Sequence, residues 1–233
     1  DPSDLTNSEP QTFYGIKDAC GKKGSTCFDT YDITTSGQFA NVKNSQITLS
    51  DQKVSGVTGV TLANNDYSTL LSTMRNDSVK GWYYNLNDPA TASERVLSRA
   101  AVLGGLVLFT TYTPAASICS IFGDSRLYAL NYETGTAYNK AIIGTSDTGV
   151  STTTSSTGTK VSKALELGKG MPTAVGIAVG EKVTGFVQKS TGEIIRIEAE
   201  SGTSVKSGAA SWKEKSGGGG TSEIETIYKH IVK

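Results

Sequence analysis

The sequence has no surplus of charge of either sign, because 22 Lys and Arg residues balance 22 Asp and Glu residues among 233. A protein that binds nucleic acid shows a basic stripe, and one held at an anionic membrane surface shows a basic patch. The balance of charge therefore argues against nucleic acid, and against an anionic membrane surface, as the main partner.

Long apolar segments are also lacking. The most apolar run covers residues 100–109 and contains two glycines, whereas a membrane helix needs roughly 20 apolar residues. This run predicts a buried strand, and we expect no membrane span. The N-terminal DPSDLTNSEP has neither the charged nor the apolar region of a signal peptide. Either a signal has been removed or the chain begins inside a longer protein, and we expect the second.

Residues for nucleophilic or metal chemistry are scarce. The only histidine, His230, lies near the C-terminus behind the glycine run 217–220, which is a poor position for a Ser-His-Asp arrangement. Neither a G-x-S-x-G elbow nor a phosphate-binding glycine loop is present. We therefore expect no catalytic residues and no cofactor-binding residues in this chain.

Hard-metal ligands occur only in patterns that are typical of turns. Two Asn/Asp clusters supply oxygen ligands of the kind calcium prefers, but neither has the D-x-[DN]-x-[DN]-G spacing. We interpret both as turns and expect no metal site. The clusters are Asn64-Asn65-Asp66 and Asn76-Asp77. Four carboxylates beside turns are interpreted as solvated, since nothing marks any two of them as a catalytic pair. They are Asp124, Glu133, Glu166 and Glu193.

The cysteines are few, but two of them are close together. Cys20 and Cys27 enclose a short Gly- and Lys-containing segment, which favours a local disulfide and an oxidising compartment. The alternative is two free thiols in a reduced protein. Cys119 is either a buried thiol or the partner of a cysteine outside this chain. A zinc site is disfavoured, because two cysteines do not make four ligands.

The sequence is rich in residues that favour strands and turns. It contains 26 glycines and only 19% charged residues, and glycine supplies the positive φ that tight turns need. Strand character recurs in short segments, and Gly104-Gly105 predicts a hairpin turn within residues 95–113. The aromatic residues in these strands are expected in the core. The strand segments are 11–18, 81–86, 95–113, 125–135 and 182–200.

An internal repeat narrows the fold class. A strand runs into a Thr-Gly turn at Thr134-Gly135 and again at Thr191-Gly192, 57 residues later. Sequence repeats at this spacing are typical of propeller blades. We expect an all-β fold, a partial β-propeller of about four to five antiparallel blades, over residues 1–215. A Gly-rich link and a helix-like C-terminal segment should follow at 216–233. Residues 66–77 predict either a short helix or a loop.

Several segments occur in a familiar order. GWYYNL (81–86) is followed by ERVLSRAAVLGGLVLFTTYTP (94–114), Cys119 and SRLYALNYETGTAY (125–138). GKGMPTAVGIAVG (168–180), GFVQKSTGEI (185–194) and Ser211-Trp212 come next, and QTFYGIKD (11–18) extends the match towards the N-terminus. This ordered set resembles the C-terminal propeller of the PilC/PilY family, large proteins of type IV pilus assembly and tip adhesion.

The resemblance implies a non-catalytic structural and interaction module that supports pilus biogenesis and adhesion. It implies an exported protein at the pilus tip or outer membrane, on the cell surface. The expected partners are minor pilins, other pilus-tip subunits and the remaining part of the parent propeller. The family's Asp-rich calcium loop and the Arg-Gly-Asp sequence are both missing here, so calcium regulation and integrin-type adhesion do not transfer.

Two alternatives come from other functional classes. A quinoprotein-like dehydrogenase has similar propeller strands, but it needs an axial calcium pocket, an acidic base and a full ring of blades. A generic exported binding propeller, unrelated to pili, is the second alternative.

We predict that Cys20 and Cys27 are joined in the exported protein. Closing a short loop restricts the unfolded chain and stabilises the fold by about 2–3 kcal/mol on the chain-entropy estimate. Mass spectrometry of non-reduced peptides should recover the two cysteines in linked form. Two free thiols in exported protein would contradict both the disulfide and the oxidising compartment.

Overall fold

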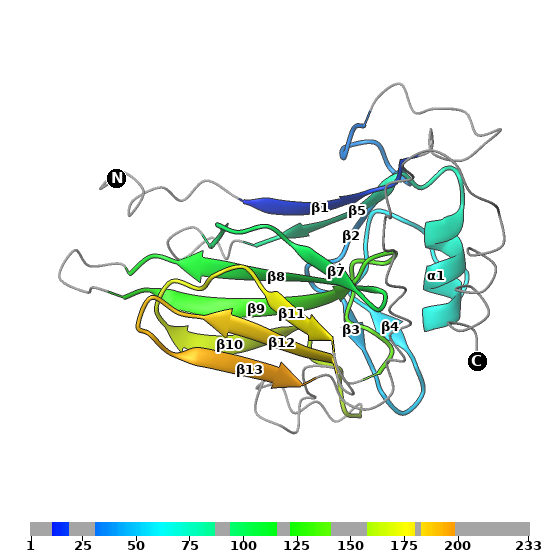
Figure 1. The fold of residues 1–233 in the computed structure, drawn as a ribbon. Helices are drawn as coiled ribbons and strands as arrows, with labels where there is room; N and C mark the ends of the chain where they lie inside the picture. The colour runs from blue at the N-terminus through cyan, green and yellow to red at the C-terminus, as the bar shows by residue number, and fades with distance from the viewer. Residues whose placement is uncertain are drawn as a thin grey trace, which may run out of the picture.

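The computed structural model of the chain contains thirteen strands and one helix in its described residues (Figure 1). The strands form four sheets, none of which closes on itself within the described ranges. The predicted all-β class is confirmed. The helix is too short to cross a membrane, as far as the described part of the chain goes. The described residues are 11–18, 31–86, 94–115, 122–140, 158–179 and 183–198.

Some predicted features lie outside these ranges and stay predictions. The domain boundary at 215/216 is among them. So are the following residues: Cys20, Cys27, Cys119, His230 and 216–233.

The first sheet has three strands in the order β1-β5-β2. β1 (Thr12–Ile16) pairs antiparallel with β5 (Gly81–Asn85), and β2 (Phe39–Asn41) pairs parallel with the other side of β5. Both predicted strands, 11–18 and 81–86, are therefore confirmed. The parallel pair was not predicted, because strand direction does not appear in local sequence.

The central sheet is the largest, with the order β10-β9-β8-β6 and β7 also paired to β8. Gly104 and Gly105 have φ of 56° and 87° and join β7 to β8 in the predicted two-residue hairpin. The first arm of that hairpin, predicted as one strand, is split into β6 and β7, which pair separately with β8. The strands are β6 (Arg95–Val96), β7 (Ala101–Leu103), β8 (Leu106–Thr113), β9 (Asp124–Asn131) and β10 (Ala164–Lys169).

The third sheet is a meander of β11 (Gly176–Val179), β12 (Val183–Gln188) and β13 (Ile194–Glu198). Both Thr-Gly turns exist, and Gly135 and Gly192 have φ of 68° and 88°. Only the second one closes a hairpin, between β12 and β13. The first follows β9, whose neighbours are β8 and β10.

The remaining elements form a small unit beside the sheets. β3 (Gln46–Ile47) pairs with β4 (Val54–Ser55), and helix α1 (Tyr67–Arg75) follows. Of the two readings for residues 66–77, the structure has the helix. Its side chains Leu70 and Met74 are buried in the core, so its apolar stripe is local core.

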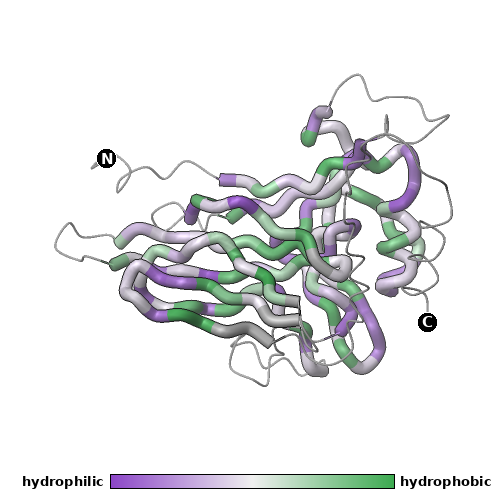
Figure 2. The backbone as a smooth tube through the Cα atoms, viewed as in Figure 1, coloured by the Kyte–Doolittle hydropathy of each residue, from purple (hydrophilic) through white to green (hydrophobic). Residues whose placement is uncertain are grey.

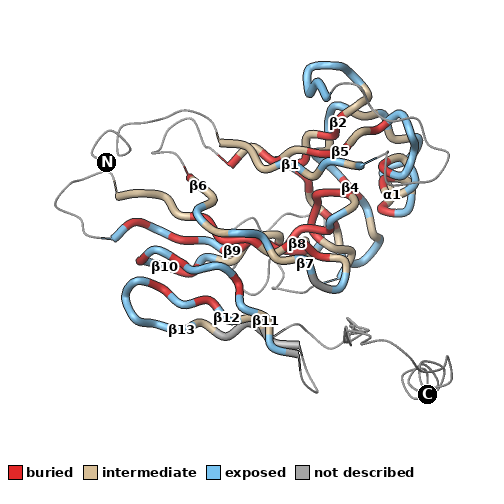
Figure 3. Tube along the Cα trace, turned by 45° about the horizontal axis from the view of Figure 1, so that its top comes forward, coloured by how far each residue is buried: buried red, intermediate tan, exposed pale blue. Residues whose placement is uncertain are grey.

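The central sheet is covered on both faces. One core cluster fills the space between it, the first sheet and α1, and a second lies between it and the third sheet. Burial follows this layering along β8 and β9 (Figure 3). Hydrophobic residues therefore follow one another along β8 without strict alternation (Figure 2), as expected for a strand buried on two sides.

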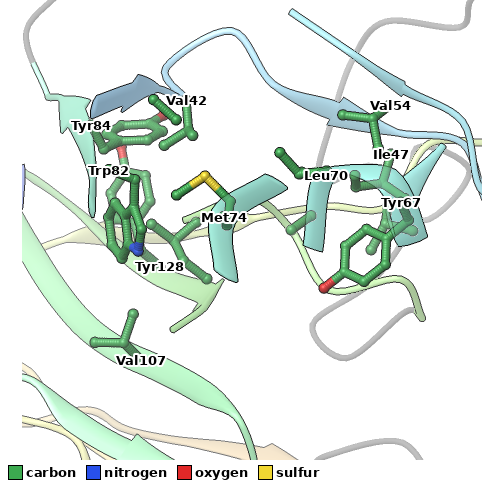
Figure 4. Close-up of a cluster of buried hydrophobic side chains, with 14 of the residues drawn as sticks. Val42, Ile47, Val54, Tyr67, Leu70, Met74, Trp82, Tyr84, Val107 and Tyr128 are labelled. Carbon is green, nitrogen blue, oxygen red and sulfur yellow. The ribbon is translucent and has the colours of Figure 1, made fainter. Parts of the chain in front are cut away.

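The first core cluster is organised by Trp82, whose side chain is 2% exposed (Figure 4). A Cβ atom added at Gly15 would lie 2.1 Å from the indole, and one added at Gly135 would lie 2.3 Å from it. The indole therefore occupies a slot between two glycines. Its Nε1 donates to the carbonyl of Tyr132 at 2.9 Å, which satisfies the only polar atom of the buried ring.

Substitution of Gly15 by Ala should destabilise the fold by about 1–3 kcal/mol, because the added methyl group overpacks the indole slot. Urea unfolding measures the loss. The matched control is Gly176→Ala, also in a strand, where the nearest atom is 3.8 Å away. We expect little change in the free energy of unfolding for this control. Equal losses of stability in both variants would contradict the close fit of the indole against Gly15.

Candidate functional site

The outer edge of β1 has backbone N–H and C=O groups that pair with no other described strand. Lys17 donates to the Lys80 carbonyl at 2.8 Å, and Leu86 donates to the Gln11 carbonyl at 2.9 Å, so the odd-numbered residues bond to β5. In an antiparallel pair the alternate residues direct their N–H and C=O groups away. The N–H and C=O groups of residues 12, 14 and 16 therefore face the outer edge, where no other described strand pairs with them.

The side chains of β1 divide between the core and the outside. Phe13 stacks on Phe109 of β8 with ring centroids 4.0 Å apart, which fixes β1 to the central sheet. Tyr14 and Ile16 lie on the opposite face and are 42% and 56% exposed. The ring centroids of Tyr14 and Tyr83 of β5 lie 6.4 Å apart, so Tyr83 also lies on this outer face. Tyr83 is half-buried, whereas its neighbour Trp82 is buried.

This edge has the properties of a strand-docking surface. Its sequence, TFYGI, contains no proline and no charge, whereas exposed edges are usually protected by such residues. A partner strand that docked here would gain main-chain hydrogen bonds, and the exposed tyrosine and isoleucine would supply apolar contacts.

The predicted oxygen clusters serve as turns. Asp66 precedes α1 and pairs with Lys53 at 2.5 Å. Asn76 ends the helix and accepts from the N–H and hydroxyl of Ser78. No group of three metal-ligating side chains occurs in the described ranges.

The four carboxylates predicted to be solvated each have a cationic neighbour. Every one of them lies in a separate ion pair, and the described residues bring no two of them together as a catalytic pair. The pairs are Asp124–Lys169, Glu133–Arg75, Glu166–Arg126 and Glu193–Lys189.

A buried carboxylate, Glu94, was missed by sequence reasoning. It is 4% exposed and accepts hydrogen bonds from the Thr111 and Tyr128 hydroxyls at 2.5 and 2.9 Å. Nη1 of Arg126 lies 3.3 Å from Oε2 of Glu94. Burial raises the pKa of Tyr128 far above its usual value, so its phenol remains a donor. These partners compensate the charge that burial would otherwise make costly.

A partly buried lysine, Lys163, was missed as well. Its Nζ donates to three backbone carbonyls in the turn after β2, of Val42, Lys43 and Ser45, at 2.5–3.4 Å. The same nitrogen lies 5.0 Å from the centre of the Tyr84 ring. Burial, and then repulsion from Lys43, lowers the pKa of Lys163 to about 8. The Lys163 amine therefore holds the turn after β2 in place, but its positive charge is destabilised by burial and by Lys43.

Neither of these two residues left a signal in the sequence. Lys163 lies just before β10, and the two residues before it, Val161 and Ser162, are both buried, so no alternation marks its position. Glu94 stands immediately before β6, where no periodic pattern marks it.

Comparison with family models, curated proteins and solved structures finds no match to this chain.

The stability of the fold should rise as Lys163 loses its proton. Its pKa is about 8 in the folded chain, against 10.5 ordinarily, so the unfolded chain binds more protons between these values and stability increases with pH. The effect of Lys163 should be measured between pH 8 and 10. Above pH 10, tyrosines ionise in the unfolded chain, where their ordinary pKa is 10.0, and this lowers the stability of the fold.

Urea unfolding at pH 7.5, 8.5 and 9.5 tests this for the wild type, Lys163→Met and Lys163→Arg. The wild type should gain stability relative to both variants, since methionine never carries the charge and arginine never loses it. The same pH dependence in all three proteins would assign the effect to other groups.

Proposed function

We propose that this chain is a non-catalytic structural and interaction module of an exported type IV pilus assembly and tip-adhesin protein. The ordered segments that resemble those of the PilC/PilY family support the assignment. The structural observation that carries it is the free edge of β1, because an interaction module needs a surface prepared for a partner.

The arrangement of sheets supports a partial propeller as the finer description of the fold. Three sheets follow one another in space, with the central one covered on both faces. Neighbouring blades of a propeller also pack face to face. The outer strands of this stack have no further partner among the strands that the structure describes, and further blades from the parent protein are the natural continuation.

The partners that fit this surface are minor pilins or other pilus-tip subunits, together with the rest of the parent propeller. The surroundings would be extracellular, at the pilus tip or outer membrane. The strand edge offers main-chain bonding and a small apolar face rather than a charged patch, which favours a protein partner that presents an extended segment.

Binding of the full chain to purified soluble domains of minor pilins from the same cells tests the proposal. We expect measurable association, and Tyr14→Pro should weaken it at least tenfold. Proline at this position removes an outward N–H and leaves the bonds of β1 to β5 in place. The matched control is Tyr14→Thr, which keeps the N–H and should retain most of the binding.

Circular dichroism confirms that both variants fold. Absence of binding to every minor pilin would refute the pilus assignment. Binding to exported proteins unrelated to pili would favour the generic binding propeller in its place.

A further inference from the structure

A hollow of about 480 Å³ lies between the turn after β2, the start of β3 and the segment that leads into β10. Its walls come from two stretches of the chain, 43–46 and 160–164. Backbone hydrogen bonds from Val161 to Ile47 and from Leu49 to Thr159 hold these stretches side by side. β2 borders β5 on the side opposite to β1, so the hollow is separate from the edge used in the interaction proposed above.

The titratable side chains that line the hollow are all cationic. They are Lys43, Lys160 and Lys163, and no carboxylate is among the described residues of its lining. All three lysines are half-buried, although lysine is usually among the most exposed residues. The net charge of the whole chain is zero. Three lysines gathered on one concave surface therefore produce a local positive potential, which low-dielectric walls concentrate.

The charge of Lys163 is fixed in position at the wall. Its ammonium group donates to the carbonyls of Val42, Lys43 and Ser45, which carry no full negative charge. None of the ion pairs formed among the described residues includes Lys163. Burial, and then repulsion from Lys43, lowers its pKa to about 8. An anion in the hollow would supply the opposite charge that favours the protonated amine.

The other side of the hollow presents hydrogen-bond donors. Lys160 donates to Oε1 of Gln46, so the Gln46 amide is oriented with its oxygen toward the lysine, and its nitrogen is the end that donates. Phosphate and carboxylate oxygens form short, charge-assisted hydrogen bonds with ammonium groups. A cationic ligand would be repelled by three like charges. An apolar ligand would find only Val161 and Ala164 as aliphatic residues of the wall.

We propose that this hollow binds a small polyanion, a molecule with at least two phosphate or carboxylate groups. Three lysines match a multivalent ligand better than a monovalent one, because a single negative charge would leave most of the positive charge uncompensated. Lys43 and Lys160 would contact the ligand, while Lys163, whose protons go to carbonyls, would act through its charge. The volume exceeds that of a single inorganic ion and lies within the range of small-molecule sites.

Isothermal titration calorimetry with the full chain at pH 7.5 and constant ionic strength tests the proposal. Pyrophosphate and citrate are the probes, and they distinguish a phosphate ligand from a carboxylate ligand. At least one of them should bind with a millimolar or lower Kd. Lys43→Gln and Lys160→Gln should each weaken that binding on the order of tenfold, because each removes a charged hydrogen-bond donor.

Lys140→Gln is the matched control, since it makes the same change of net charge at an exposed lysine outside the hollow. Its binding should equal that of the wild type. Failure of both probes to bind, or equal binding by the wild type, Lys43→Gln and Lys160→Gln, would overturn the proposal. An equal loss in Lys140→Gln would also overturn it, by assigning the effect to net charge. The edge variant Tyr14→Pro should bind the polyanion like the wild type, which keeps this test independent of the test with minor pilins.

Discussion

The indole of Trp82 joins three segments that are far apart in the sequence. It lies against Gly15 of β1 and Gly135 of the turn after β9, and it donates to the Tyr132 carbonyl. A larger residue at either glycine would displace the ring. The first sheet and the turn after β9 are therefore held together through one side chain.

The central strands β8 and β9 have apolar layers on both faces, so a polar group beside them needs hydrogen-bond partners or an opposite charge. Glu94 and Lys163 meet this requirement in different ways. Glu94 has two hydroxyl donors and a nearby guanidinium, so its charge is compensated. Lys163 has three carbonyls, which satisfy its protons, but carbonyls carry no full negative charge. A lowered pKa is the consequence.

β1 separates the requirements of folding from those of binding. Phe13 and Gly15 face the central sheet and fit against Phe109 and Trp82. The alternate residues contribute little to the core and present both side chains and backbone groups to the outside. A strand with this division can change its outer residues to suit a partner while its inner residues keep the fold.

The sequence by itself determined the local elements. Gly104-Gly105 predicts its hairpin because a two-residue turn needs positive φ at both positions, and the Thr-Gly turns and strand segments follow from equally local preferences. Pairing between distant segments was decided only by the tertiary structure. Lys163 donates to carbonyls 118–121 residues away in the sequence. Local sequence carries no record of such contacts, since they depend on how whole sheets stack. The free edge of β1 was decided in the same way, because an edge is a property of the order of strands in a sheet.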